Sequence, residues 1–198
     1  MKKIILITSV LLQSILVLSQ SISKGKNVLY LGAGAGHGFF GSSKYKGSGY
    51  TYRSSPTIHL GFEHGISEAI PNSVIGIGGS ISSWFASQHY IDKWGYGWDK
   101  RWTDITALVK GYYHHKKLVG EKWDVYAAVM AGIKHRTYAY SNNDPYYNNA
   151  YRDESGIYPA GGIAIGGRLY VSKVFGFYAE AGAGINIDYV QAGFAFKF

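Results

Sequence analysis

The sequence predicts an all-β fold: an eight-stranded antiparallel up-and-down transmembrane β-barrel, preceded by a cleaved signal peptide. Three observations predict it. The chain opens with a short charged and then apolar segment, the rest divides into runs of alternating residues, and the less apolar phase of those runs is rich in glycine. Charged residues make up only 16% of the chain, against about a quarter in a soluble domain, which suits an outer surface that contacts lipid.

Residues 1–19 have the layout of a secretory signal peptide. Lys2 and Lys3 form a positive start, and a nearly continuous apolar run follows from Ile4 to Leu18. This run is shorter than the roughly 20 residues that a membrane-spanning helix needs, so we expect cleavage after Ser19 rather than an anchor. The mature domain is then residues 20–198. It has no cysteine for a disulfide or for attachment of a lipid.

Eight runs of alternating residues follow, separated by gaps rich in turn-forming residues. The runs cover about 28–40, 54–64, 74–87, 101–115, 123–138, 157–171, 175–186 and 188–198. The gaps 41–53, 88–100 and 139–156 are long and polar, whereas the gaps 65–73, 116–122 and 172–174 are short. Long loops at one end and tight turns at the other are typical of bacterial outer-membrane barrels, and an even number of strands places both termini at the short-turn, periplasmic end.

Each run has one apolar phase and one phase that is polar or small, as a strand with two different faces requires. In order along the chain, the polar or small phase holds Gly32, Gly34 and Gly36; His59 and Glu63; Gly76 and Gly78; Asp104 and Lys110; Tyr126 and Lys134; Arg168 and Tyr170; Glu180, Gly182 and Gly184; and Gln191 and Lys197. The other phase is apolar, as at Val125, Ile163 and Phe194. Each run therefore predicts one strand with a single apolar face.

The composition of the second phase indicates which face points outward. Alternation alone fits a soluble barrel with its apolar face inside and a membrane barrel with its apolar face outside. A phase that faced water would be rich in charged residues and threonine, but this one is rich in glycine, which is costly in an exposed strand. Inside a narrow barrel, glycine leaves room for large side chains such as Tyr30, Trp84 and Tyr126. We therefore expect the apolar phase to contact lipid.

The lumen is expected to hold a network of charged side chains. Its members are Glu63, Asp104, Lys110, Lys134, Arg168, Glu180 and Lys197, with His59 in the same phase. Opposite charges directly across two strands attract, and a buried charge needs a partner. A tight turn at 172–174 brings Arg168 opposite Glu180. A turn centred near Val119 brings Asp104 opposite Lys134, and it also brings His114 opposite Asp124.

The two ends of the mature chain carry a family resemblance. The first run contains Gly32-Ala33-Gly34-Ala35-Gly36, and the last alternates from Val190 to a terminal phenylalanine. With the signal peptide and the eight runs, this pattern resembles the OmpA/OmpX-like small outer-membrane β-barrels of Gram-negative bacteria, over essentially the whole mature chain. The resemblance implies the cell outer membrane as the location. It also implies that Phe196 and Phe198 form a signal for the outer-membrane assembly machinery.

The sequence predicts no catalytic residue, no cofactor and no metal site. The His-x-Ser-Asn motif of one class of lipid A deacylases is incomplete, because Ser141 and Asn142 follow Ala139 where a histidine is needed. His114 and His115 are adjacent on a strand and so point to opposite faces. A lipid A-modifying enzyme that uses Ser87, His89 and Asp92 stays open as an alternative, and so does a narrow pore for small solutes.

The long gaps offer candidate contact residues for surface partners, because Tyr and Asn are common in adaptable recognition surfaces. The candidates are Tyr90, Trp94, Trp98, Tyr146, Tyr147 and Tyr151. The net charge of +8 favours the phosphates of lipopolysaccharide and anionic lipid as partners in an exported protein, and no motif indicates nucleic acid. We expect a monomer with a structural or surface-interaction role, whose loops contact lipopolysaccharide, glycans or a partner.

Overall fold

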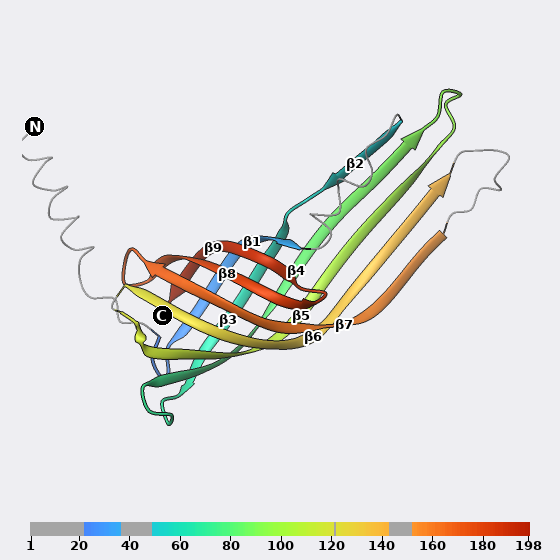
Figure 1. Ribbon diagram of the computed structural model, residues 1–198. Coiled ribbons are helices and arrows are strands. Elements are labelled where there is room, and N and C mark those ends of the chain that lie inside the picture. Colours follow the sequence, from blue (N-terminus) through green and yellow to red (C-terminus); the bar gives the residue numbers. More distant parts are fainter. Residues whose placement is uncertain (1–21, 37–48, 121, 143–151) are drawn as a thin grey trace, which may run out of the picture.

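The computed structural model describes residues 22–36, 49–120, 122–142 and 152–198 (Figure 1). The expected signal peptide and its cleavage site lie outside these residues. The strands are β1 (Asn27–Gly36), β2 (Tyr50–Ser54), β3 (Thr57–Ser67), β4 (Ser73–Ile91), β5 (Gly97–Val119), β6 (Trp123–Asn142), β7 (Arg152–Tyr170), β8 (Phe175–Ile185) and β9 (Asp188–Lys197). Among the described residues there is no helix with the length and apolar character needed to cross a bilayer.

The strands close into a ring in which every neighbour is antiparallel. β1 pairs with β3 on one side and with β9 on the other, and from β3 to β9 each strand pairs with the next along the chain. β2 and β3 both pair with β4 and are separated by Ser55 and Pro56, so they act as one interrupted strand. Proline has no backbone N–H to donate to the ladder. The nine segments thus form an eight-stranded barrel, and the predicted fold class is confirmed.

The apolar phase of the strands points outward. Val109 and Val129 are each 63% exposed and Ile165 is 68% exposed, whereas Glu63 and Lys110 are 0% and 2% exposed. A soluble protein would not leave so many aliphatic side chains in water while burying its charges. The exterior therefore faces lipid, and a closed antiparallel barrel of this kind is a transmembrane protein of the bacterial outer membrane.

The lumen is packed with large side chains that lie against glycines. The ring of Tyr30 occupies the space that a side chain at Gly61 would need, and the ring of Tyr126 does the same at Gly166. Two buried apolar clusters fill the interior; one holds Ile22, Val28, Tyr30, Val74, Tyr170, Tyr178 and Ala195, and the other Tyr112, Tyr126, Ala128, Met130 and Ala164. The glycine-rich phase therefore makes room for aromatic rings in the lumen, as expected.

The strands on one side of the barrel are longer than predicted. The predicted gap 88–100 is wrong, because β4 continues to Ile91 and β5 begins at Gly97. The gap 139–156 is likewise reduced, since β6 runs to Asn142 and β7 starts at Arg152. The outer ends of β2 and β4 to β7 extend well past the turn between β8 and β9, at the end opposite to the start of β1 and the end of β9 (Figure 1). They form a projecting sheet that extends past the band of exposed aliphatic side chains on the barrel wall. This band, the apolar belt, includes Val109, Val129 and Ile165.

Candidate functional site

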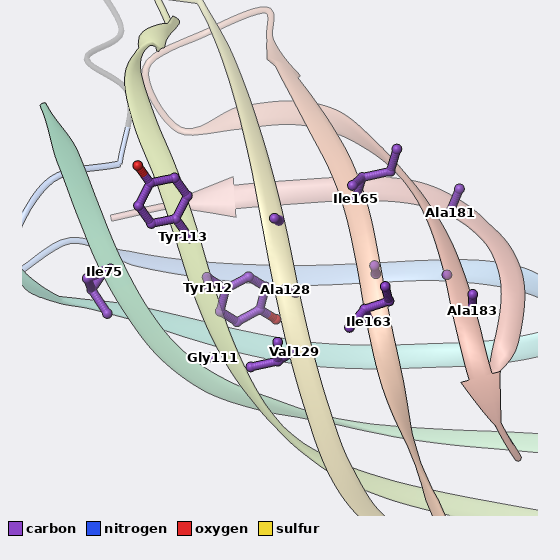
Figure 2. A pocket seen from close by; sticks show the side chains of 13 residues that line it. Ile75, Gly111, Tyr112, Tyr113, Ala128, Val129, Ile163, Ile165, Ala181 and Ala183 are labelled. Carbon is purple, nitrogen blue, oxygen red and sulfur yellow. The ribbon is translucent and has the colours of Figure 1, made fainter.

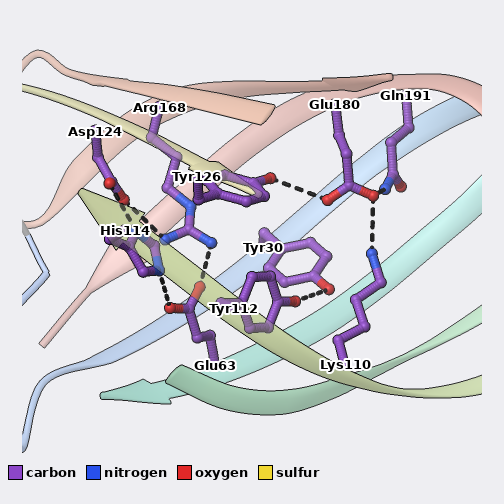
Figure 3. Close-up of polar contacts among 10 residues, drawn as sticks. All are labelled: Tyr30, Glu63, Lys110, Tyr112, His114, Asp124, Tyr126, Arg168, Glu180 and Gln191. Carbon is purple, nitrogen blue, oxygen red and sulfur yellow. Dashed lines mark hydrogen bonds and ion pairs between the residues drawn. The ribbon is translucent and has the colours of Figure 1, made fainter. Parts of the chain in front are cut away.

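A buried ionic cluster occupies the half of the lumen nearer the termini. His114 lies 2.7 Å from a carboxylate oxygen of Glu63 through Nε2 and 2.7 Å from one of Asp124 through Nδ1. Carboxylates accept hydrogen bonds, so both ring nitrogens donate and the imidazole is positively charged. Arg168 donates to the same two carboxylates, at 3.1 Å for Asp124 (Figure 3). Two cations thus neutralise two anions, and all four side chains are at most 1% exposed.

The predicted ion pair between Arg168 and Glu180 is wrong. Arg168 lies opposite Tyr178, and Glu180 lies opposite Gly166. The pairing of Arg168 with Tyr178 centres the turn between β7 and β8 on residue 173. The predicted pairing of Arg168 with Glu180 would require a turn centred on residue 174. A shift of one residue at the turn moves each partner by two positions, which keeps every side chain on its face.

Glu180 instead belongs to a second cluster, further along the lumen. Its carboxylate accepts from Lys110 Nζ at 2.9 Å, from the Tyr126 hydroxyl at 3.0 Å and from the Gln191 side-chain amide (Figure 3). The hydroxyls of Tyr30 and Tyr112 are 2.9 Å apart beside it. This cluster fills the middle of the barrel with side chains that bond to one another.

The remaining members of the expected lumen set lie near the two ends. Asp104 accepts two hydrogen bonds of 2.7 Å from Arg136 and lies 3.4 Å from Lys134. Arg136, and not Lys134, lies directly opposite Asp104 in the β5–β6 ladder. The turn between these two strands is centred one residue later than predicted. Lys197 is buried near the termini, with its ammonium 4.2 Å from the centroid of the Tyr170 ring. His59 bonds to Asp188 at 2.5 Å.

The other candidate site is the inner face of the projecting sheet, which comprises residues 50–54, 84–91, 97–104, 136–142 and 152–156. Strand register places Tyr50 beside Tyr90, and Tyr90 beside Trp98. Their ring centroids are 4.5 Å apart for the tyrosine pair, and 5.8 Å and 5.9 Å from Trp98. Trp102 and Tyr138 form a second pair, at 5.6 Å. Rigid strands thus hold several half-buried rings on one face.

Cations lie among these rings. Lys100 Nζ is 4.4 Å from the centroid of the Trp98 ring and 6.0 Å from that of Tyr140. Arg136 and Lys134 share the single carboxylate of Asp104 at the base of the sheet. Among the described side chains this face therefore carries more positive than negative charge. Aromatic rings and cations together can bind a ligand that has both apolar surfaces and anionic groups.

The structure separates the residues that the sequence grouped as loop contacts. Tyr90 and Trp98 lie together on paired strands. Trp94 lies apart from them at the tip of the β4–β5 hairpin, where it is 73% exposed and Lys93 Nζ is 5.0 Å from its ring centroid. Tyr146, Tyr147 and Tyr151 lie outside the described residues. The sequence prediction missed Tyr50, Lys100 and Trp102 as members of this face, and it ended a strand at Tyr138 and assigned Tyr140 to a loop and not to a strand. Their common signal is that they continue the inward phase of their strands.

The alternative set of Ser87, His89 and Asp92 is not brought together as one site. His89 Nδ1 lies 2.8 Å from Asp99. Asp92 instead accepts hydrogen bonds from the backbone N–H groups of Trp94 and Tyr96, at 2.8 and 2.9 Å, and so shapes the hairpin turn. Within the part of the chain that the structure describes, no group of three or more His, Asp or Glu residues could hold a metal ion.

The two C-terminal aromatics lie at the end of the barrel where β9 ends beside the start of β1. Phe196 packs against Phe175, with ring centroids 5.4 Å apart, on the lipid-facing side. Phe198 is 61% exposed, and its backbone exchanges hydrogen bonds of 2.8 and 3.0 Å with Asn27. The last residue thus takes part in closing β9 against β1.

Comparisons with known proteins give similarity at the level of structure. No family model matches the sequence, and no curated protein matches it. The chain is similar to Ail, the attachment invasion locus protein of Yersinia pestis, solved with the heparin analogue sucrose octasulfate: identity is 14% and the TM-score 0.45, over 89% of this chain and 100% of Ail. It is also similar to the N-terminal β-barrel domain of Pseudomonas aeruginosa OprF, at 12% identity and a TM-score of 0.39, over 89% of this chain and 98% of that domain.

Proposed function

We propose that this outer-membrane barrel is a surface-interaction protein without catalytic activity, and that the inner face of its projecting sheet binds anionic carbohydrate. The candidate ligands are the sugars of lipopolysaccharide and other surface glycans. The observation that carries the proposal is the cluster of Tyr50, Tyr90 and Trp98 with the ammonium of Lys100 above the Trp98 ring. These groups are held by paired strands beyond the apolar belt, where water-soluble ligands have access.

The chemistry of this cluster suits a sugar that carries phosphate or carboxylate groups. Tyrosine and tryptophan offer large apolar faces with a polar edge, so they can pack on the C–H face of a sugar ring and bond to its hydroxyls. Lys100 and Arg136 can pair with anionic groups, and Arg136 can do so through its planar fork. Strand-borne rings also lose little conformational freedom on binding, which favours affinity.

A narrow pore is less well supported by the lumen. Lys110, Glu180, Tyr126 and Gln191 bond to one another across the middle of the barrel. Apolar clusters lie on both sides of this group. A solute would have to displace groups that already satisfy each other, so the interior favours a structural role.

The test is binding of detergent-solubilised protein to polysaccharide released from lipopolysaccharide, measured by titration calorimetry with neutral dextran as a negative control. Trp98→Ala should weaken binding about tenfold, as expected for a buried aromatic contact. Lys100→Gln should weaken it and reduce its salt dependence. The matched control is Trp94→Ala, which removes the exposed tryptophan at the hairpin tip and should bind like wild type. Equal affinity of Trp98→Ala and Trp94→Ala would contradict the proposal.

A further inference from the structure

The lipid-facing wall of the barrel contains a depression of about 720 Å³ that spans β4 to β8 (Figure 2). Two adjacent cross-strand rows of outward-facing residues form it. One row is Ile75, Tyr113, Ala127, Ile165 and Ala181, and the other is Gly111, Val129, Ile163 and Ala183. Gly111 and Ala127 leave a hollow between larger neighbours, so the wall is not an even cylinder here.

The size and chemistry of this depression suit a hydrocarbon chain. Its outward-facing side chains are apolar except for the phenol of Tyr113. Its volume falls within the range of about 300 to 1,000 Å³ that is usual for sites that hold a small molecule. Because it opens to the hydrocarbon region of the bilayer, an acyl chain can fill it without desolvating any polar group.

A cationic rim lies beyond the depression, toward the end of the barrel where β9 ends beside the start of β1. Beyond Tyr113 the register of β5 with β6 becomes irregular, and the strand runs on to Lys117, about 20 Å along the chain from Gly111. Lys122 lies at the same end, just before β6, and both lysines are exposed. This end is the periplasmic end, so the rim lies at the level of the inner-leaflet headgroups.

Lys116 is paired with a carboxylate, whereas within the described part of the chain no such pair is found for the nearby Lys117 and Lys122. Lys116 Nζ lies 2.6 Å from Glu68, and hydrogen bonds from Lys116 and the backbone N–H of Lys24 lower the pKa of the Glu68 carboxyl. No ion pair joins Lys117 or Lys122 to a carboxylate among the residues that the structure describes. Two unneutralised ammonium groups beside an apolar hollow match the charge pattern of an anionic phospholipid.

We propose that this wall is a binding site for one anionic phospholipid of the periplasmic leaflet, with an acyl chain in the depression and the headgroup phosphate at Lys117 and Lys122. The site lies on the lipid-facing wall toward the periplasmic end, whereas the projecting sheet lies at the opposite end. It is therefore independent of the carbohydrate site, and each proposal can fail without the other.

The experiment titrates the purified full chain, released from detergent micelles, with phosphatidylglycerol or phosphatidylcholine and counts bound lipid by native mass spectrometry. Wild type should bind one phosphatidylglycerol about tenfold more tightly than phosphatidylcholine. Ala127→Leu fills the hollow and should weaken binding of both lipids about tenfold. The double variant Lys117→Gln/Lys122→Gln should keep the binding of phosphatidylcholine and lose the preference for phosphatidylglycerol.

The matched control is Ala131→Leu, which makes the same change on the same face of β6 but outside the depression, and it should bind lipid like wild type. Each variant is first checked for the heat-dependent gel migration of a folded barrel. Equal lipid affinity of Ala127→Leu and wild type would overturn the site, and unchanged lipid preference in the double lysine variant would overturn the headgroup assignment. A dimer of wild type that Ala127→Leu abolishes would show that a second copy, rather than lipid, occupies the wall.

Discussion

Arg168 is the side chain that links the two carboxylates, Glu63 and Asp124, of the buried ionic cluster in the lumen. It donates to Glu63 and to Asp124, and its own side chain is 1% exposed. Without it, the single positive charge of His114 would face two carboxylates whose side chains are fully buried. A buried charge that loses its partner costs far more than the intact pair contributes, because the charge cannot be rehydrated. The stability of this barrel should therefore depend on Arg168 more than on any exposed cation.

Replacement of Arg168 by methionine should lower the free energy of unfolding by about 3 to 5 kcal/mol. The measurement is urea unfolding of the barrel in micelles, followed by gel migration or tryptophan fluorescence. Arg101→Met is the matched control, because Arg101 is exposed and its loss should change stability by no more than about 0.5 kcal/mol. Equal unfolding midpoints for the two variants would contradict the role of the cluster.

A double-mutant cycle distinguishes the observed pairing from the one expected along the sequence. Arg168 contacts Glu63, whereas Glu180 contacts Lys110 and Gln191. Arg168→Met combined with Glu63→Gln should show a coupling energy of about 1 to 3 kcal/mol. Arg168→Met with Glu180→Gln should show a smaller coupling, because these two residues are connected only through Tyr126. Strong coupling of Arg168 to Glu180 would support the pairing that the structure contradicts.

At the scale of the strands, the length of β4 to β7 beyond the apolar belt is what the sequence pattern underestimated. Within the bilayer one face of a strand must be apolar, so alternation marks it clearly, as at Ile105 and Val109. Beyond the bilayer neither face contacts lipid, and the alternation disappears although the backbone pairing continues. Trp98 and Lys100 therefore resemble a polar loop in sequence but occupy a paired strand.

The last strand closes the ring, and its final residue contributes to that closure. Deletion of Phe198 removes two backbone hydrogen bonds to Asn27 and an exposed aromatic at the periplasmic rim. It should lower the fraction of protein that assembles in the outer membrane, measured by membrane fractionation and heat-dependent gel migration. Phe198→Ala keeps the backbone bonds and tests the aromatic alone. Normal assembly of both variants would contradict a role for Phe198 as an assembly signal.

At the scale of the whole molecule, the barrel is a filled cylinder with an apolar exterior and a polar extension at one end. The lumen contains its own counter-charges, which supports the proposed structural role over a passage. The two binding surfaces that we propose are the projecting sheet outside the bilayer and the uneven wall within it. The buried carboxylates of the lumen are paired with cations, whereas the two proposed binding surfaces are accessible from outside the barrel.

The filled lumen predicts that the purified protein will not conduct ions. In planar bilayers it should produce no discrete current steps under conditions in which a large porin conducts. Lys110 and Gln191 both bond to Glu180 and fill the axis, as is usual in an eight-stranded barrel. Simultaneous replacement of Tyr30, Tyr112 and Tyr126 by alanine removes three buried rings and should produce small currents if the protein still folds. Reproducible steps from wild type would instead favour the narrow pore.

The sequence by itself determined the barrel, the direction of its faces and the residue types in its lumen, because alternation and glycine content depend only on which side of each strand meets lipid. Tertiary structure decided which charges pair, since a turn centre that moves by one residue shifts partners by two positions without changing their face. Arg168 thus meets Glu63, 105 positions away in sequence, across the lumen. Only the closed ring brings these residues together, and only strand pairing beyond the bilayer gathers Tyr50, Tyr90 and Trp98 on one face.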